Sequence, residues 1–237
     1  MTSEKKPLRI AVLFEDVQMT DLAGLDILGN LSTASVQFAS QINPQFASFL
    51  PLSTPMEFLY LSSTLESTIM TPSVRVVPTH TYDSAPRDLD MIVIAGPDPR
   101  KIPEASLKFL REAVQKTRVV LTTCTGAMWF AASGALDRKK ATTNRVFLPL
   151  ATKMFPNVEW QDQRWVVDKG HFEGAEIWTA GGAGCGIHMF VEYARKNFDK
   201  RIVDLSLTGL DFFPEGETGQ FYEGPVKVEI PVPASLP

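Results

Sequence analysis

Three short apolar runs constrain the fold more than any other feature of this 237-residue chain. Arg9–Phe14, Asp90–Ala95 and Arg118–Thr122 are rich in Val, Ile and Leu, with no polar–apolar alternation. Such a run is typical of a strand buried on both faces, which occurs mainly in parallel sheets. Helical patterns separate the runs, as at Glu104–Gln115, whose apolar residues share one face. The alternation predicts an α/β fold, with a mostly parallel sheet sandwiched between helices.

Other segments complete this expectation. The apolar spacing predicts helices over Thr20–Leu31 and Ile187–Asn197. Residues 32–56 carry Ser, Thr, Asn and Gln with scattered Phe, and we expect an irregular or partly helical excursion there. Two short strand patterns around Lys169-Gly170 predict an antiparallel β-hairpin near residues 158–179.

Composition narrows the class of protein. Hydrophobic residues make up 44% and charged residues 21%, which is ordinary for a globular protein. We expect a single domain over 1–237, with its core at about 8–200 and a C-terminal tail at 214–237. The net charge of −4 gives no electrostatic footprint for nucleic acid or an anionic membrane, and no apolar run is long enough to span a bilayer. With two cysteines and no recognisable signal peptide, a reducing cytoplasmic location is expected.

The most informative motif surrounds Cys124. A predicted strand runs into Thr123-Cys124-Thr125-Gly126 and then into a predicted helix, which is the layout of a nucleophile elbow. The helix N-terminus favours a thiolate, so we expect a lowered pKa at Cys124. Gly126 allows a close backbone approach. The alternative is that Cys124 is simply a small buried hydrophobic residue.

A reactive thiol needs a proton partner, and the sequence leaves two candidates open. Asp21 follows the first strand at its carboxyl end, where open α/β sheets place their ligands, although it is also suited to cap a helix. His188 opens the last predicted helix, just after a Gly-rich turn. His80 and His171 fall in predicted loop and turn segments, where a solvated histidine is the default.

The Gly-rich segment 181–186 also contains Cys185, which we interpret as a small residue in a tight turn. The segment does not have the spacing of a dinucleotide-binding loop, and no acidic residue of the required kind follows. The chain has no P-loop, no paired histidines and no Cys-x-x-Cys, so neither a cofactor nor a metal ion is expected.

Three segments together resemble the ThiJ/PfpI superfamily, which has the flavodoxin-like, class I glutamine amidotransferase-like fold. They are the Cys124 elbow with the sequence that follows it to Thr143, the segment Trp178–His188, and Asp21-Leu-Ala-Gly24. Within the superfamily the chain looks most like the isonitrile hydratase branch. The resemblance implies Cys124 as the nucleophile and Asp21 as its acid–base partner. It also implies a homodimer.

The resemblance further implies that the Thr125 amide and the backbone around Gly96 stabilise an anion. The chain departs from the branch at this point, because Pro97 stands where a second glycine is usual and proline has no amide hydrogen. His188 replaces an aspartate, and Asn144 replaces a histidine that follows Ala-Thr-Thr in many relatives.

The expected function is cysteine-dependent hydration of a small electrophilic molecule, most specifically an isonitrile to an N-substituted formamide. A cofactor-free hydrolase, lyase or glyoxalase acting on a small carbonyl or amide is an alternative enzyme, and one possible setting for it is a biosynthetic step. An alternative from a different class of function is a redox-sensing or chaperone-like protein, in which Cys124 is oxidised and no substrate is turned over. The sensor half of a transcription regulator is disfavoured, because no helix-turn-helix pattern follows residue 200.

Overall fold

The computed structural model describes residues 6–212, which form two compact units. One, the sheet unit, comprises residues 8–23 and 57–189. The other, the helical unit, comprises the described residues of 6–7, 24–56 and 190–212. The predicted tail at 214–237 lies outside the described residues. The single domain over 1–237, its core at about 8–200 and the homodimer therefore stay predictions.

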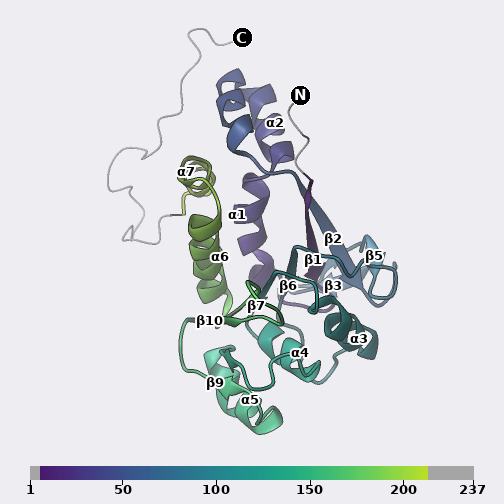
Figure 1. Ribbon diagram of the computed structural model, residues 1–237. Helices are drawn as coiled ribbons and strands as arrows, with labels where there is room; N and C mark the ends of the chain where they lie inside the picture. The colour runs from purple at the N-terminus through teal and green to yellow at the C-terminus, as the bar shows by residue number, and fades with distance from the viewer. Residues whose placement is uncertain (1–5, 213–237) are drawn as a thin grey trace. The chain divides into compact units, whose positions relative to one another are not determined.

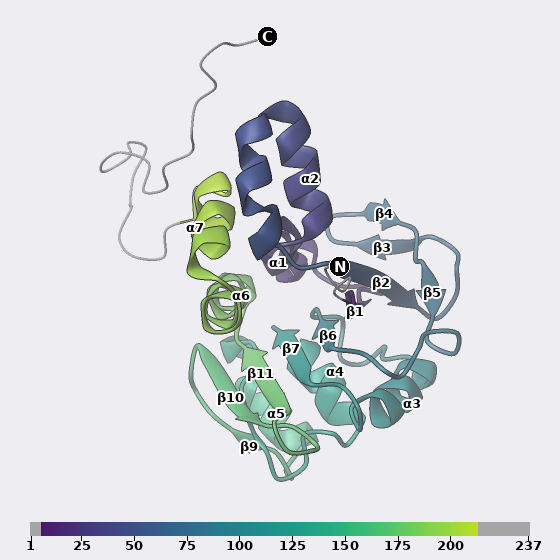
Figure 2. The same cartoon turned by 45° about the horizontal axis from the view of Figure 1, so that its top comes forward.

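The sheet unit is built on a seven-stranded sheet with the order β10-β11-β7-β6-β1-β2-β5 (Figure 2). All the pairings whose register is known are parallel except β10 with β11. The strands are β1 (Leu8–Leu13), β2 (Met56–Ser62), β5 (His80–Thr81), β6 (Met91–Ile94), β7 (Val119–Thr123), β10 (Trp165–Lys169) and β11 (Glu176–Ala180). The predicted α/β class with a mostly parallel sheet is therefore confirmed.

The three apolar runs form the centre of this sheet. β1, β6 and β7 are adjacent, and the register aligns Ile10 with Met91 and Met91 with Val119. Residues 10–13 and 91–94 are buried at every position, so both faces of these strands are covered, as a run without alternation predicts.

Helices and short pairs of strands complete the sheet unit. α4 packs against β6 and β7, and α3 packs against α4 (Figures 1 and 2). The remaining elements are η1 (Met19–Leu22), β3 (Thr68–Met70), β4 (Val74–Val76), α3 (Glu104–Ala113), α4 (Gly126–Ala132), β8 (Lys140–Ala141), η3 (Arg145–Phe147), α5 (Leu148–Met154) and β9 (Glu159–Trp160). β3 and β4 form a small antiparallel hairpin of their own.

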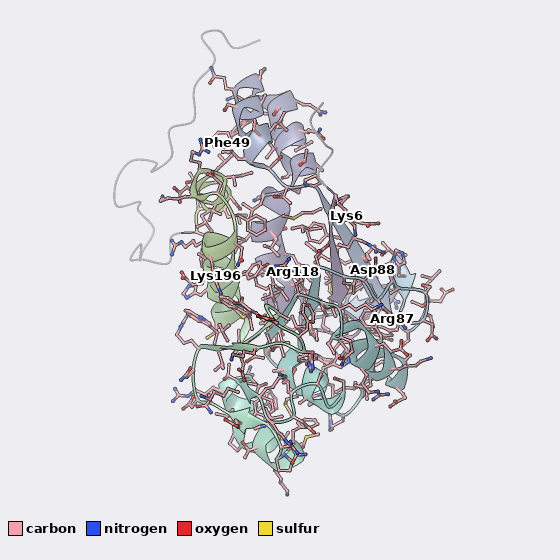
Figure 3. The ribbon with its side chains drawn as sticks, viewed as in Figure 1. Lys6, Phe49, Arg87, Asp88, Arg118 and Lys196 are labelled. Atoms are coloured by element: carbon pink, nitrogen blue, oxygen red, sulfur yellow. The ribbon has the colours of Figure 1, made fainter. Side chains whose placement is uncertain are left out.

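Ion pairs link the segment before β6 to α3 and to β1. Arg87 and Asp88 lie next to one another before β6 (Figure 3). The Arg87 Nε atom is 2.9 Å from the Glu112 carboxylate on α3, and the Asp88 carboxylate is 2.7 Å from the Arg9 guanidinium on β1. These pairs are partly exposed, so they contribute little stability individually.

The helical unit contains α1 (Gly24–Asn30), α2 (Thr33–Ile42), η2 (Pro44–Leu52) and α7 (Lys200–Gly209). α1 packs against α2 and α7, and Gly24 lies so close to Phe190 that any side chain there would overlap the ring. The segment 32–56 is thus more helical than expected. Ser32 caps α2 with its side chain, and Asn43 caps η2.

Three predicted boundaries need correction. The helix expected over 20–31 is divided into η1 and α1, which begins at Gly24. α6 (Ala183–Asn197) begins four residues before Ile187, because most of the Gly-rich segment is itself helical. The hairpin expected near 158–179 is found as β10 and β11, whereas residues 159–160 form β9 and pair in parallel with β8.

Gly126 offers a test of the packing between α4 and the sheet. A Cβ atom there would lie 2.4 Å from the backbone oxygen of Ile94, which cannot move away cheaply. We expect Gly126→Ala to lower the free energy of unfolding by about 1–3 kcal/mol in urea denaturation, as overpacking does. Gly184→Ala on α6 is the control, because its added Cβ meets no atom within 4 Å other than those of the adjoining helix backbone. Equal midpoints for the two variants would contradict the tight contact.

Candidate functional site

Cys124 is the point at which the chain turns from β7 into α4. Its φ of 60° is in the left-handed region, which a residue with a side chain adopts at a cost of about 1–2 kcal/mol. The turn is held by hydrogen bonds from the Cys124 amide to the carbonyls of Ala180 and Gly181. The Cys124 carbonyl in turn accepts the Thr143 hydroxyl at 2.8 Å. The predicted elbow is therefore present, with a backbone that the surrounding structure fixes.

Asp21 reaches this elbow through pairing between two loops. The Gln18 amide donates to the Gly96 carbonyl at 3.0 Å, and Val17 forms an antiparallel bridge with Pro97. Asp21 lies in the single turn of η1 that follows. The Oδ2 atom of Asp21 accepts a hydrogen bond from the Gly96 amide at 3.1 Å. Within the described residues its Oδ1 is buried without a hydrogen-bond partner. A carboxyl oxygen left in this state favours the protonated acid.

Gly96 lies between the Asp21 carboxylate and the elbow at Cys124 and Thr125. A Cβ atom at Gly96 would lie 2.6 Å from Asp21 Oδ2 and 2.7 Å from the Thr125 hydroxyl. That hydroxyl donates to the Pro97 carbonyl at 2.7 Å. The Gly96 amide is directed to Asp21, and Pro97 has none, so the Thr125 amide is the backbone donor that stabilises charge on the Cys124 sulfur.

The two titratable groups act on each other. Burial raises the pKa of Asp21 to about 6, while the Gly96 amide and Cys124 oppose that rise. Burial, and next the negative charge of Asp21, raise the pKa of Cys124 above its usual value, against the effects of Asn144 and the Thr125 amide. The expected lowering of the Cys124 pKa is therefore wrong. α4 begins just after Cys124, as expected, but burial of the thiol and, next, the negative charge of Asp21 raise the pKa of Cys124.

Asn144 is a site residue that the sequence did not indicate as one. Its side-chain amide donates to Cys124 Sγ at 3.2 Å. The sequence marked this position only as a departure from related chains, and the contact joins residues 20 positions apart. A polar residue that follows Thr142 and Thr143 was the available signal.

A cavity of about 590 Å³ opens onto this group. Cys124, Thr125 and Asn144 lie at its reactive end, together with Gly96 and Pro97. The remaining lining residues are Asp16, Gln18, Thr71, Asp98, Pro99, Arg100, Phe147 and Leu150. Asp98 and Arg100 form an ion pair with N–O distances of 2.7 and 2.9 Å. Phe147 and Leu150 supply an apolar wall.

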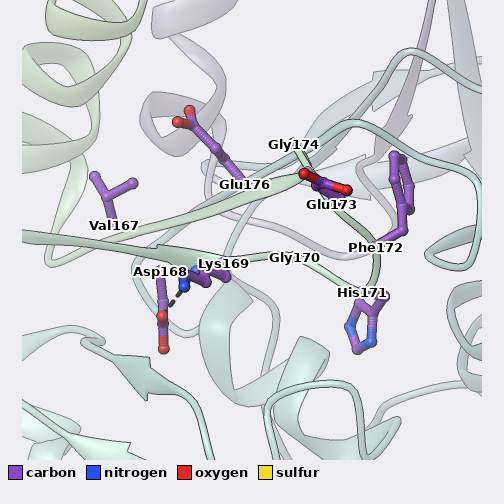
Figure 4. A pocket seen from close by; sticks show the side chains of 10 residues that line it. Val167, Asp168, Lys169, Gly170, His171, Phe172, Glu173, Gly174 and Glu176 are labelled. Carbon is purple, nitrogen blue, oxygen red and sulfur yellow. Dashed lines mark hydrogen bonds between the residues drawn. The ribbon is translucent and has the colours of Figure 1, made fainter.

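The histidines lie elsewhere. His188, in the second turn of α6, is hydrogen-bonded to Arg164 and is not among the cavity-lining residues. His80 is bonded to Thr79. His171 lines a separate cavity formed by residues 167–176 of the β10–β11 hairpin (Figure 4). The structure thus brings Asp21, but not His188, to Cys124.

Two other sequence interpretations concern thiol and metal chemistry. Cys185 is the third residue of α6, so it lies in a helix and not in the tight turn expected; its sulfur is 3.4 Å from the position of a Cβ on Gly181. Within residues 6–212, no group of three or more His, Cys, Asp or Glu side chains is arranged to hold a metal ion. No helix in the same range is long and apolar enough to cross a bilayer.

The sheet, the strained cysteine and the buried carboxylate define an α/β protein with a nucleophile-elbow site. The model of the DJ-1/PfpI family matches residues 56–195, more than half of the chain, and the chain belongs to that family. An isonitrile hydratase from Pseudomonas putida is 27% identical over 207 residues, which are 86% of this chain and 77% of that protein.

Solved structures confirm the fold. A THiJ/PfpI family protein from Pseudomonas syringae superposes with a TM-score of 0.68 at 18% identity, covering 96% of this chain and 82% of that one. An AraC family transcriptional regulator from Pseudomonas putida gives 0.64 at 14% identity, covering 86% and 100%. Because a regulator shares the fold, the fold alone does not decide between an enzyme and another class of function.

The raised pKa of Asp21 predicts a pH-dependent stability. An acid whose pKa is higher in the folded than in the unfolded chain stabilises the fold at low pH, and this contribution is lost as pH rises from about 4 through about 6. Asp21→Asn removes the effect, so between pH 4 and 7 the variant should gain about 2–3 kcal/mol over the unmodified protein in urea unfolding.

Asp98→Asn is the control for this measurement. Arg100 lowers the pKa of the partly exposed Asp98, so the contribution of that carboxylate is already complete near pH 4, and the stability difference between this variant and the unmodified protein should stay constant from pH 4 to 7. A difference between Asp21→Asn and the unmodified protein that does not change with pH would show that Asp21 is not held as a buried acid.

Proposed function

We propose that this protein hydrates isonitriles to N-substituted formamides, with Cys124 as the nucleophile and Asp21 as the proton carrier. The observation that carries the proposal is the pair itself. Asp21 is 2% exposed, has a pKa of about 6 and lies beside a cysteine on a strained elbow. A carboxyl group with a pKa near neutrality both gives and takes protons at physiological pH. The similarity to an isonitrile hydratase supports the same chemistry.

The first half of the reaction forms a covalent intermediate. The Cys124 thiol passes its proton to the Asp21 carboxylate, and the resulting thiolate attacks the terminal carbon of the isonitrile. The carbon–sulfur bond forms as the lone pair of that carbon takes the proton from Asp21. The product is a thioimidate, R–N=CH–S–Cys, and Asp21 is again ionised. Forming such an intermediate divides one difficult step into two easier ones.

The second half uses water. Asp21 assists the addition of water across the carbon–nitrogen double bond, so that oxygen joins the carbon and the nitrogen gains a hydrogen. The carbon–sulfur bond then breaks with the electron pair on sulfur, and the hydroxyl proton passes to Asp21 as the carbonyl forms. The formamide leaves, and the proton returns to Cys124. The balance is one isonitrile and one water for one formamide, with no oxidant or cofactor.

The cavity supports a substrate whose substituent is apolar. Phe147 and Leu150 line it, while its ion pair, Asp98 with Arg100, is internally neutralised. An alkyl or aryl group placed against the two apolar side chains would be removed from contact with water. This favours binding by a free energy of about 25 cal/mol per Å² of apolar surface buried. The isonitrile carbon would then face the Cys124 sulfur.

The central test combines turnover with thiol reactivity in Asp21→Asn. Formamide formation should fall by about 10²–10⁴-fold, because a positioned proton carrier is lost. Alkylation of Cys124 by iodoacetamide should become faster at pH 7, because removing the Asp21 charge lowers the pKa of the thiol. These opposite changes distinguish proton transfer from a general disturbance of the site. Formamide is measured by NMR and alkylation by mass spectrometry.

Two cysteine variants serve as controls for this test. Cys124→Ser should abolish turnover, whereas Cys185→Ser, in the turn at the start of α6, should retain it. Unchanged formamide production in folded Asp21→Asn would remove Asp21 from the mechanism. Absence of turnover for every isonitrile, with turnover of a 2-oxoaldehyde, would overturn the proposal in favour of other small-carbonyl chemistry. Cys124 oxidation without any turnover would instead favour redox sensing.

The apolar wall predicts a size-dependent effect of Leu150→Ala. For tert-butyl isonitrile, kcat/KM should fall roughly fivefold, because part of the buried apolar contact is lost. For methyl isonitrile it should stay nearly constant. Val146→Ala is the matched control, since Val146 belongs to the same segment but is 82% exposed and is not among the cavity-lining residues. Equal losses for both substrates would contradict the assignment of this wall to the substituent.

A further inference from the structure

We propose that Asn144 is a further catalytic residue: its amide stabilises the Cys124 thiolate and, because it cannot accept the thiol proton, leaves that proton to Asp21. The inference rests on the proposed role of Cys124 as nucleophile. It concerns a residue that contacts the reacting sulfur directly, with Nδ2 at 3.2 Å from Sγ.

The orientation of the Asn144 amide is fixed by its other end. Asn144 caps η3, and its Oδ1 accepts the Val146 amide at 3.0 Å. With the oxygen committed to that bond, the NH₂ group is the end that faces the sulfur. An amide NH₂ donates hydrogen bonds and has no capacity to take up a proton. The contact therefore favours a negatively charged sulfur, as donation to a charged acceptor does.

The backbone that carries Asn144 is pinned to the elbow. The Thr142 amide donates to the Thr179 hydroxyl on β11 at 2.8 Å, and the Thr142 hydroxyl donates to the Gln163 carbonyl at 3.1 Å. The Thr143 hydroxyl donates to the carbonyl of Cys124 itself. These bonds lie in a buried or partly buried setting, so the amide keeps its place without being reordered during the reaction.

The charged groups around the Cys124 sulfur are consistent with separate roles for Asp21 and Asn144. Asp21 is the buried carboxyl group whose charge acts on Cys124. Asp16, Asp98 and Arg100 also line the cavity, and the last two are paired with each other. Asn144 thus offsets the repulsion between Asp21 and a thiolate without competing for the proton. When the carbon–sulfur bond of the thioimidate breaks, the same amide receives the charge that returns to sulfur.

The test uses substitutions that keep the cap and remove the donor. Ser and Asp cap helices about as well as Asn, so Asn144→Ser and Asn144→Asp should fold with unchanged thermal midpoints. In a Cys185→Ser background, the midpoint of the iodoacetamide alkylation profile against pH should rise by about one to two pH units in Asn144→Ser, because a hydrogen bond to a charged group is lost. Asn144→Asp should raise it further, since a second carboxylate then faces the sulfur.

Asn157→Ser is the matched control, because the Asn157 amide donates to Asp137, and neither residue is among those lining the cavity. Its alkylation profile should not move. An unchanged midpoint in folded Asn144→Ser, or equal midpoints in the Ser and Asp variants, would overturn the role of Asn144. The measurement needs no isonitrile, so this failure is distinct from failure of the proposed hydration. If hydration is found, Asn144→Ser should accumulate the thioimidate, detected as added mass on Cys124.

Discussion

The left-handed backbone of Cys124 is the constraint on which the site depends. Such a conformation at a residue with a side chain persists only when its surroundings over-determine it. Here the carbonyls at the end of β11 hold the amide, and Thr143 holds the carbonyl. The same contacts that support the turn thus bring the segments after β8 and β11 to the sulfur. The strain at Cys124 and the placing of Asn144 beside its sulfur therefore share one set of hydrogen bonds, whereas the pairing of Gln18 with Gly96 brings Asp21 to the elbow.

The electrostatic interaction between Asp21 and Cys124 affects the protonation of both groups. A buried carboxylate and a thiolate in proximity form a like-charge pair, so the two groups titrate together and hold one proton between them over a wide pH range. Their arrangement differs from that of a thiol activated by a neighbouring cation, where the charged nucleophile is stable at rest. In the proposed mechanism the resting thiol is protonated, because its pKa is raised, and the thiolate arises as its proton moves to Asp21.

Local sequence patterns predicted the sheet and part of the site. The runs that became β1, β6 and β7 were recognisable because a strand buried on both faces has an unmistakable composition. Cys124 was recognisable from the strand, turn and helix around it, and Asp21 from its place after the first strand. In each case the signal lies within a few residues of the position it describes.

The features that were missed depend on distant contacts. Asn144 reaches the sulfur only because Thr142 and Thr143 bond to β11 and to the elbow. His188 was placed at a helix start, but α6 begins at Ala183 and the imidazole is bonded to Arg164 instead. The pKa of Cys124 rises because its thiol is buried and because the charge of Asp21 lies beside it, and no local pattern reveals either effect.

The cavity draws its reactive and its apolar parts from different kinds of structure. Cys124 and Gly96 directly follow strands of the sheet, where packing leaves little freedom, whereas Phe147 and Leu150 belong to η3 and α5, which are not part of that sheet. Both apolar residues remain more than one third exposed, so exchanging them disturbs little of the interior. If the proposed hydration is correct, substitutions at Phe147 and Leu150 change which substituent is preferred and leave Cys124 and its neighbours unchanged. Under the proposed function, a scaffold organised in this way suits the evolution of proteins that share one reaction and differ in the substituent they accept.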